Sequence, residues 1–127
     1  MTRKIIITAA ILGMLGVIAG AFAAHGLRPK RSVSQLDVWY TAVQYQFYHV
    51  FALLFLSTFT RNSKLIAASY YLFTLGIVFF SGSLYLLACL DLLGLHISNI
   101  IGPITPLGGT LFIAGWATLA LAAIRNK

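Results

Sequence analysis

The side chains of this chain with the greatest capacity for chemistry are histidines, tyrosines and serines that interrupt long apolar segments. A histidine in such a setting can carry a proton or hold a ligand, and it can equally be a hydrogen-bonded core residue. On a helix, one broad polar face would hold Thr41, Gln44, Tyr45, Tyr48, His49 and Ala52, opposite an apolar face of Val43, Phe47, Val50 and Leu54. We expect the polar face to point into the protein.

A second polar face, in the next apolar segment, lies at a matching depth. At a rise of about 1.5 Å per residue, His49 lies about 16 Å beyond Val38 and Ser81 about 14 Å before Leu90, which predicts a contact between His49 and Ser81. Trp116 lies at a comparable depth in the last apolar segment and, if buried, needs a partner for its indole N–H. The predicted polar cluster comprises Gln44, Tyr45, Tyr48, His49, Ser81, Ser83 and Tyr85.

These residues do not form a catalytic or metal-binding pattern. The sequence has no nucleophile elbow, no phosphate-binding glycine loop and no pair of carboxylates within an apolar segment. His25 is about 16 Å from His49 in depth by helical rise, which disfavours a shared metal ion. His96 could approach His25, but two histidines without a carboxylate or thiolate are a weak metal signal. We therefore expect no enzyme activity, no metal and no cofactor.

The composition excludes an ordinary soluble domain. Of the 127 residues, 60% are apolar and 9% are charged, whereas a soluble domain has roughly 25% charged residues. The net charge of +7 comes from bases at the edges of apolar segments, which is typical of membrane flanks and excludes a nucleic-acid patch. The single cysteine, Cys89, excludes an internal disulfide.

Four apolar segments are long enough to cross about 30 Å of hydrocarbon as helices. The first could be mistaken for a secretory signal, but it exceeds the roughly 7–15 residues of a signal core, so we expect a retained helix. Between the third and fourth segments, residues 92–104 are expected to lie in the membrane interface. The sequence predicts one all-α domain over residues 1–127, an integral membrane four-helix bundle with helices at about 5–24, 38–60, 65–90 and 106–124.

The distribution of bases predicts the orientation. With both termini in the cytoplasm, three bases lie outside and six lie inside: Arg3, Lys4, Arg61, Lys64, Arg125 and Lys127. The outer bases Arg28, Lys30 and Arg31 form either a solvated loop or, together with Trp39, an interfacial segment that contacts anionic lipid. Asp91 could pair with Arg28 or Lys30, although an exposed pair contributes little.

Small residues mark the faces where helices approach closely. Gly13, Gly16 and Gly20 share one face of the first helix, and Gly82 lies between Ser81 and Ser83. Such faces allow close packing in a membrane, where lipid gives helices no hydrophobic reason to associate. The face on the first helix serves either packing inside the chain or a homo-oligomer seam.

Four motifs, in order, resemble one family: GAFAAHGL at 20–27, TAVQYQFYH at 41–49, FSGSLY at 80–85 and GPITPLGGT at 102–110. The chain resembles domain-of-unknown-function family 423, which includes the YgdD-type bacterial inner-membrane proteins and the transmembrane protein 256 group. Ala23 stands where glycine is usual and Phe47 where methionine is common. The resemblance implies a small four-helix bacterial inner-membrane protein, and it implies no reaction.

Two classes of function follow from these patterns. The first is a noncatalytic membrane module that associates with itself, with a larger membrane complex or with membrane lipids. The alternative is a small transporter, channel or proton-linked carrier with a polar site around His49, which would need an oligomer to enclose a conduit.

Overall fold

A computed structural model describes residues 1–61 and 63–125, and these residues form helices joined by short loops. Two of the helices contain a π-helical segment, labelled η, that continues them without a break. The elements are α1 (Thr2–Phe22), η1 (Ala23–Leu27), α2 (Val33–Leu56), α3 (Lys64–Gly76), η2 (Ile77–Ser81), α4 (Gly82–Cys89), α5 (Ser98–Ile101) and α6 (Ile104–Arg125).

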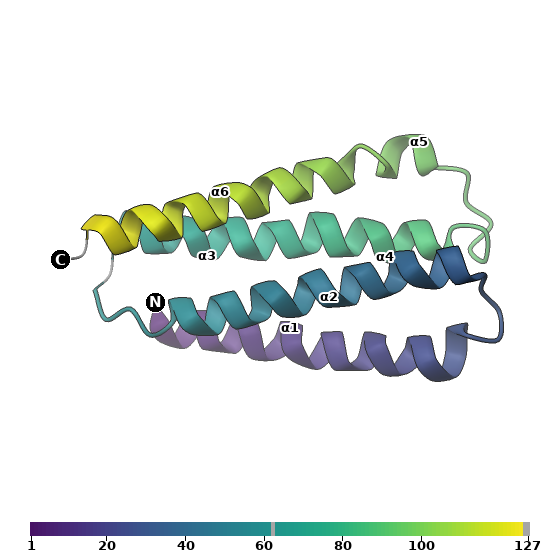
Figure 1. Cartoon of the computed structure of the whole chain (residues 1–127), viewed down its shortest axis with the longest axis horizontal. Helices are drawn as coiled ribbons and strands as arrows, with labels where there is room; N and C mark the ends of the chain where they lie inside the picture. Colours follow the sequence, from purple (N-terminus) through teal and green to yellow (C-terminus); the bar gives the residue numbers. More distant parts are fainter. Residues whose placement is uncertain (62, 126–127) are drawn as a thin grey trace.

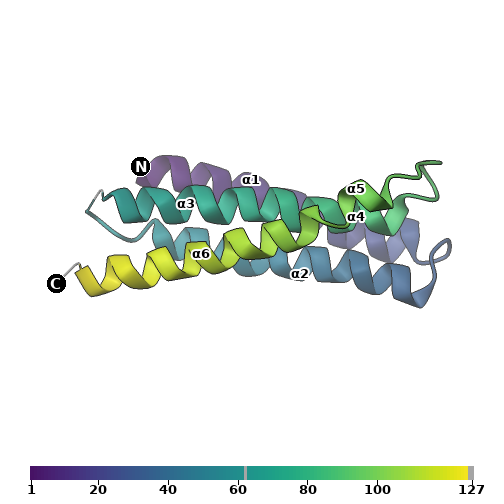
Figure 2. The ribbon, with the colours of Figure 1, turned by 90° about the horizontal axis from the view of Figure 1, so that it is seen from above.

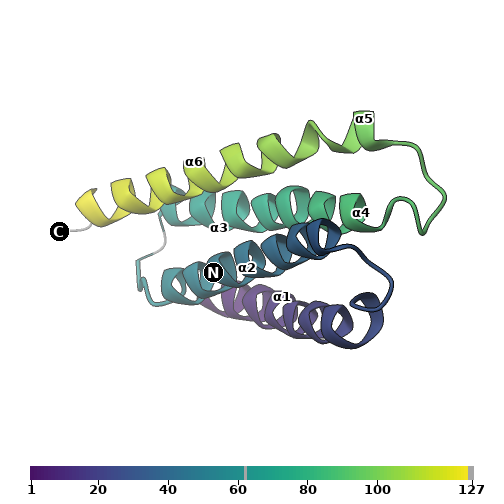
Figure 3. The ribbon, with the colours of Figure 1, turned by 45° about the vertical axis from the view of Figure 1, so that its right-hand side comes forward.

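The helices are arranged as two packed pairs. α1 packs on α2, and α6 packs on α3 and η2, while α2 joins the pairs through its contacts with α3, η2 and α4. Figure 1 shows the order α6, α3–α4, α2 and α1 across the bundle, and Figure 3 shows the same order from a second direction. The N-terminus lies beside the α2–α3 loop and the C-terminal end of α6 (Figure 2). We call this end of the bundle the terminal end. The loops after η1 and α4 form the opposite, loop end.

The second helix begins earlier than the sequence predicts. It starts at Val33 rather than Val38, because Ser32 and Gln35 form a capping box in which each side chain bonds the other's backbone N–H. It also ends at Leu56 rather than Thr60, where Ser57 and Thr58 form a turn. Trp39, which was expected in an interfacial segment, therefore lies in the second turn of α2.

The other predicted boundaries are closer. The first helical run covers residues 2–27 instead of 5–24, since η1 adds a turn in which the Arg28 N–H bonds the Ala23 carbonyl at 3.0 Å. The third covers residues 64–89, and α6 begins at Ile104, two residues before the predicted start. Lys127, which the orientation argument counts, lies outside the described residues.

Three helical runs are long and apolar enough to cross a membrane: Thr2–Leu27, Lys64–Cys89 and Ser98–Arg125. The α2 helix is not among these three, and its polar side chains include Gln35, Asp37, Gln44, Gln46 and His49. The prediction of an all-helical protein with long apolar spans is confirmed.

Buried side chains form two apolar clusters. The larger lies toward the terminal end and includes Ile5, Leu53, Phe73 and Phe112. The smaller, toward the loop end, includes Leu27, Trp39 and Ala88. Trp39 is only 9% exposed, and its indole N–H donates to the Ala19 carbonyl at 2.9 Å. The predicted contact of Trp39 with lipid is wrong, because its ring packs against Phe22 and Tyr85 inside the bundle.

The glycines differ in how closely another helix approaches them. A Cβ atom on Gly108 would lie 2.3 Å from the backbone nitrogen of Phe80, so this glycine lets α6 touch the backbone of η2. A Cβ on Gly16 would meet the Phe47 ring at 2.8 Å. Gly13 and Gly20 have only ordinary contacts with α2, and nothing lies within 4 Å of a Cβ on Gly82. Gly82 therefore does not serve the close approach within the chain that its sequence context suggests.

Candidate functional site

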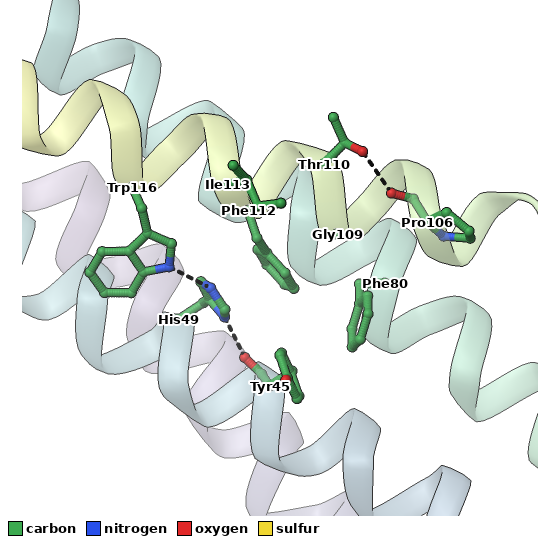
Figure 4. A pocket seen from close by; sticks show the side chains of 9 residues that line it. All are labelled: Tyr45, His49, Phe80, Pro106, Gly109, Thr110, Phe112, Ile113 and Trp116. Carbon is green, nitrogen blue, oxygen red and sulfur yellow. Dashed lines mark hydrogen bonds between the residues drawn. The ribbon is translucent and has the colours of Figure 1, made fainter.

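A groove of about 420 Å³ lies on the side of the bundle, between α2, η2 and α6. Its volume is within the range of ligand pockets. Figure 4 shows its walls, which are aromatic or aliphatic over most of their surface. We call it the lateral groove; its lining residues are Tyr45, His49, Phe80, Pro106, Gly109, Thr110, Phe112, Ile113 and Trp116.

His49 is positioned at the base of this groove by contacts from two helices. Its side chain is 4% exposed. Its Nδ1 lies 2.7 Å from the Tyr45 carbonyl one turn earlier on α2, and its Nε2 lies 3.0 Å from the indole nitrogen of Trp116 on α6 (Figure 4). The indole N–H of Trp116 thus has a partner, although its side chain is 47% exposed and not buried as the prediction assumed.

These two hydrogen bonds fix the protonation of the imidazole. An indole N–H can only donate, so Nε2 of His49 must be the acceptor and carry no proton. Nδ1 then carries the hydrogen and donates to the Tyr45 carbonyl. The geometry therefore selects the neutral Nδ1–H tautomer, in which both ring nitrogens are already engaged.

Aromatic packing holds the ring in place. The Phe112 ring stacks on the imidazole with a centroid distance of 3.6 Å and an interplanar angle of 6°. Phe73 packs against it at 5.5 Å in a tilted arrangement. A ring stacked in this way has little freedom to rotate, so the Trp116 and Tyr45 hydrogen bonds are preorganised.

Three of the four polar side chains that line the lateral groove bond within the protein, and the fourth, the partly exposed Tyr45, has an aromatic ring that forms part of the wall. Besides His49 and Trp116, the Thr110 hydroxyl donates to the Pro106 carbonyl at 2.9 Å (Figure 4). An occupant of the groove would therefore meet mainly aromatic and aliphatic surface. The chemistry of the groove favours an apolar chain over a polar or charged ligand.

The predicted contact between His49 and Ser81 does not form a hydrogen bond. Ser81 is fully buried, and its hydroxyl donates instead to the Ala42 carbonyl on α2 at 2.7 Å. The Ala42 carbonyl that Ser81 contacts is about two helical turns before His49 on α2. The π-helical turn of η2 ends at Ser81, and an i→i+5 turn rotates the following residues away from the face that regular α-helical spacing assigns to them.

The remaining members of the predicted polar cluster are dispersed. Gln44 and Tyr48 are exposed on the outside of α2, and Tyr45 forms a wall of the lateral groove. The Ser83 hydroxyl pairs with the Thr105 hydroxyl of α6 at 2.6 Å. The predicted cluster is thus divided between exposed side chains, a wall of the groove and separate links between helices.

Gln46 is a buried polar residue that the face assignment missed. It donates to the Leu12 carbonyl of α1 at 2.7 Å and accepts a hydrogen bond of 2.6 Å from the Tyr85 hydroxyl of α4. It therefore joins three helices. Its spacing of three from His49 and four from Ala42 was the available signal, since residues so spaced share a face.

At the loop end, Asp91 pairs with Arg31, whereas the sequence predicts a pair with Arg28 or Lys30. Its Nη1 forms a 2.5 Å ion pair with Asp91, and its side chain is 8% exposed against 58% for the carboxylate. The Arg31 hydrogen bond lowers the pKa of Asp91. Arg28 and Lys30, the predicted partners, are exposed. Over residues 1–61 and 63–125, no three histidine, cysteine or acidic side chains gather as metal ligands would.

Long apolar helices joined by short loops define a multi-pass class of helical membrane protein. The chain belongs to the family described as "Protein of unknown function (DUF423)", whose model matches residues 19–109. This confirms the resemblance that the four motifs indicate.

Named relatives agree with this assignment. A UPF0382 membrane protein of Staphylococcus haemolyticus is 41% identical over 124 residues, covering 97% of each chain. UPF0382 membrane protein YwdK of Bacillus subtilis is 41% identical over 126 residues, covering 97% of this chain and 98% of its own length. A Haemophilus influenzae relative is 38% identical over 128 residues. No solved structure matches the chain. The protein is therefore a membrane protein of a family without an assigned activity.

Proposed function

We propose that this protein is a noncatalytic module of the bacterial cytoplasmic membrane, with four crossing helices and both termini in the cytoplasm. Its lateral groove holds one acyl chain of a membrane lipid. The observation that carries this proposal is a mainly apolar groove in which three of the four polar side chains, those of His49, Trp116 and Thr110, already have partners inside the protein.

The case for α2 as a fourth crossing helix rests on its length and its neighbours. Its 24 residues rise about 36 Å, which exceeds the roughly 30 Å of the hydrocarbon core. It lies between α1 and the α3–α4 run along the bundle (Figure 1). Gln46 and His49, which lower its apolar character, bond to neighbouring helices or to its own backbone, and this makes them tolerable at membrane depth.

The position of the lateral groove matches an acyl chain of one leaflet. On α6 the groove runs from Pro106, near the loop end, to Trp116. The ten residue-to-residue steps from Pro106 to Trp116 rise about 15 Å, which is half of the roughly 30 Å core. A chain in the groove would therefore extend from the headgroup level at the loop end to the membrane midplane.

The alternative of a proton-linked carrier finds less support. Such a site would need an imidazole nitrogen that is free to exchange a proton or bind a substrate, and both nitrogens of His49 are engaged. The hydrogen bonds and the Phe112 stack instead favour a structural role for this ring.

The test is native mass spectrometry of the protein reconstituted in phosphatidylcholine nanodiscs and released in mild detergent. We expect wild type to retain phosphatidylcholine and Gly109→Leu to lose it, since Gly109 lines the lateral groove and a Cβ there has room beside Phe80, at 3.8 Å. Gly82→Leu is the matched control, because Gly82 faces open space outside the groove. It should retain the lipid.

The same spectra report the oligomeric state and any copurifying chain. A retained lipid that only Gly109→Leu removes supports the groove assignment. Equal retention by all three proteins contradicts it. A bare monomer without lipid or partner contradicts the module itself.

A further inference from the structure

The two ends of the bundle carry very different charge. The two acidic residues of the sequence, Asp37 and Asp91, both lie toward the loop end, close to Arg28, Lys30 and Arg31 along the chain or in space. The terminal end has no acidic residue to offset its bases. Those described there are Arg3, Lys4, Arg61, Lys64 and Arg125.

Two adjoining hollows lie among these bases. One, of about 410 Å³, is lined by Arg3, Lys4, Ile7, Thr8 and Tyr70, and it lies between α1 and α3. The other, of about 480 Å³, is lined by Ser63, Lys64 and Ala67 at the start of α3. Met1 lines both, so they are neighbours. We call the pair the terminal basin.

The ammonium group of Lys4 is held in position at the terminal basin. Its Nζ donates to the Tyr71 hydroxyl at 2.7 Å and lies 4.9 Å and 5.4 Å from the centres of the Tyr71 and Tyr70 rings. Below it, the Thr8 and Tyr70 hydroxyls share a hydrogen bond of 2.7 Å that links α1 to α3. A cation placed by aromatic rings loses less freedom when it binds an anion than a free lysine does.

We propose that the terminal basin binds the phosphate of an anionic phospholipid, with Arg3, Lys4 and Lys64 as its cationic contacts. A phosphate oxyanion is the ligand that several bases without a neighbouring acid would recognise. The lipid, rather than free phosphate, is favoured because Ile7 lines the basin and the exposed apolar side chains Ile6 and Ile11 continue along α1 toward the membrane interior. This site is separate from the lateral groove and does not depend on it.

The experiment uses nanodiscs with equal amounts of phosphatidylglycerol and phosphatidylcholine, again with native mass spectrometry of the released protein. Wild type should retain phosphatidylglycerol in preference to phosphatidylcholine. Arg3→Gln/Lys64→Gln should lower that preference by about fivefold for each base removed, as expected for bases at a membrane surface. Arg28→Gln/Lys30→Gln makes the same charge change at the loop end and is the matched control.

A second variant separates placement from charge. Tyr71→Phe keeps all bases but removes the hydroxyl that holds Lys4. It should lower the preference less than the double substitution does, while leaving the helical content by circular dichroism unchanged.

Three results would overturn the proposal. The first is an equal loss of preference in the terminal and loop-end double variants, since binding would then follow net charge alone. The second is an absence of preference in wild type. The third is displacement of the lipid by inorganic phosphate but not by chloride at equal ionic strength, which would assign the basin to free phosphate. Failure of the groove proposal would appear elsewhere, as phosphatidylcholine retention that Gly109→Leu does not change.

Discussion

The indole N–H of Trp116 donates a 3.0 Å hydrogen bond to Nε2 of His49 and so joins α6 to α2 across the lateral groove. The Phe112 ring stacks on the same imidazole one turn earlier on α6. The histidine is thus held by one helix on two sides. The free energy that couples Trp116 to His49 can be measured.

A double-mutant cycle with Trp116→Phe and His49→Leu should give a coupling free energy of about 1 kcal/mol, in the range of side-chain hydrogen bonds between membrane helices. The measurement is reversible unfolding in detergent micelles. Trp116→Phe with His25→Leu is the control cycle, because His25 is exposed in η1, and its coupling should be near zero. Similar coupling in both cycles would show that the hydrogen bond contributes nothing specific.

Alanine at Gly108 and at Gly82 should have opposite effects. Gly108→Ala would place its Cβ against the Phe80 backbone, so α6 and η2 must separate, and we expect a loss of about 1–3 kcal/mol in unfolding free energy. Gly82→Ala meets open space and should gain up to about 1 kcal/mol from helix propensity. Thermal unfolding of the two variants in one detergent checks the sign. Equal stability would mean that the close approach of α6 is absent in solution.

Leucine at Gln46 and at Gln44 forms a second matched pair. Gln46→Leu removes the partner of the Tyr85 hydroxyl and the donor to Leu12, and it should cost about 1–3 kcal/mol of unfolding free energy. Gln44 is exposed, so Gln44→Leu should change stability by less than about 0.5 kcal/mol. Chemical unfolding followed by circular dichroism distinguishes them. A larger effect at Gln44 would refute the face assignment of α2.

The ion pair at the loop end makes a prediction about pH. The hydrogen bond from Arg31 holds the pKa of the Asp91 carboxyl below its ordinary value of 3.8. A carboxyl whose pKa is lower in the folded state than in the unfolded chain stabilises the fold at any pH above its unfolded pKa. This contribution is lost as the pH falls through the folded pKa. The contribution of the pair is therefore fully present near neutral pH and is lost only below about pH 3.8.

An NMR titration of the Asp91 carboxyl carbon measures this shift. Arg31→Gln should return the midpoint toward 3.8, whereas Arg28→Gln should leave it in place. A response to Arg28 instead would restore the pairing that the sequence suggested.

The helices were predictable from the sequence, and their ends were less so. The lengths of apolar sequence between the bases place the helical runs, because the backbone groups of an apolar segment away from water must form their hydrogen bonds within a helix. The start of α2 was misplaced because the apolar pattern begins at Val38, although Ser32 and Gln35 match the spacing of a capping box. Local capping here begins a helix before its apolar face does.

The depth of the candidate site was predictable for one of the two partners proposed for His49. Counting residues placed His49, Ser81 and Trp116 at similar heights, and the height of Trp116 does match its bond to His49. Ser81 instead bonds to α2 at Ala42, about two helical turns from His49. The direction in which each side chain points depends on which neighbour its helix face meets and on the π-helical turn that ends at Ser81. Neither is visible in the hydrophobic period. Exposed Gln44 and buried Gln46 differ for the same reason.

Several hydrogen bonds between helices end on a backbone carbonyl rather than on a second side chain. The donor residues are Trp39, Gln46, Ser69 and Ser81, and the accepting carbonyls belong to Ala19, Leu12, Gly115 and Ala42. Every residue type supplies that carbonyl, so the accepting position can change its side chain while the hydrogen bond persists. Sequence drift in this protein should therefore be asymmetric, with donors under strict constraint and their acceptors limited only by size.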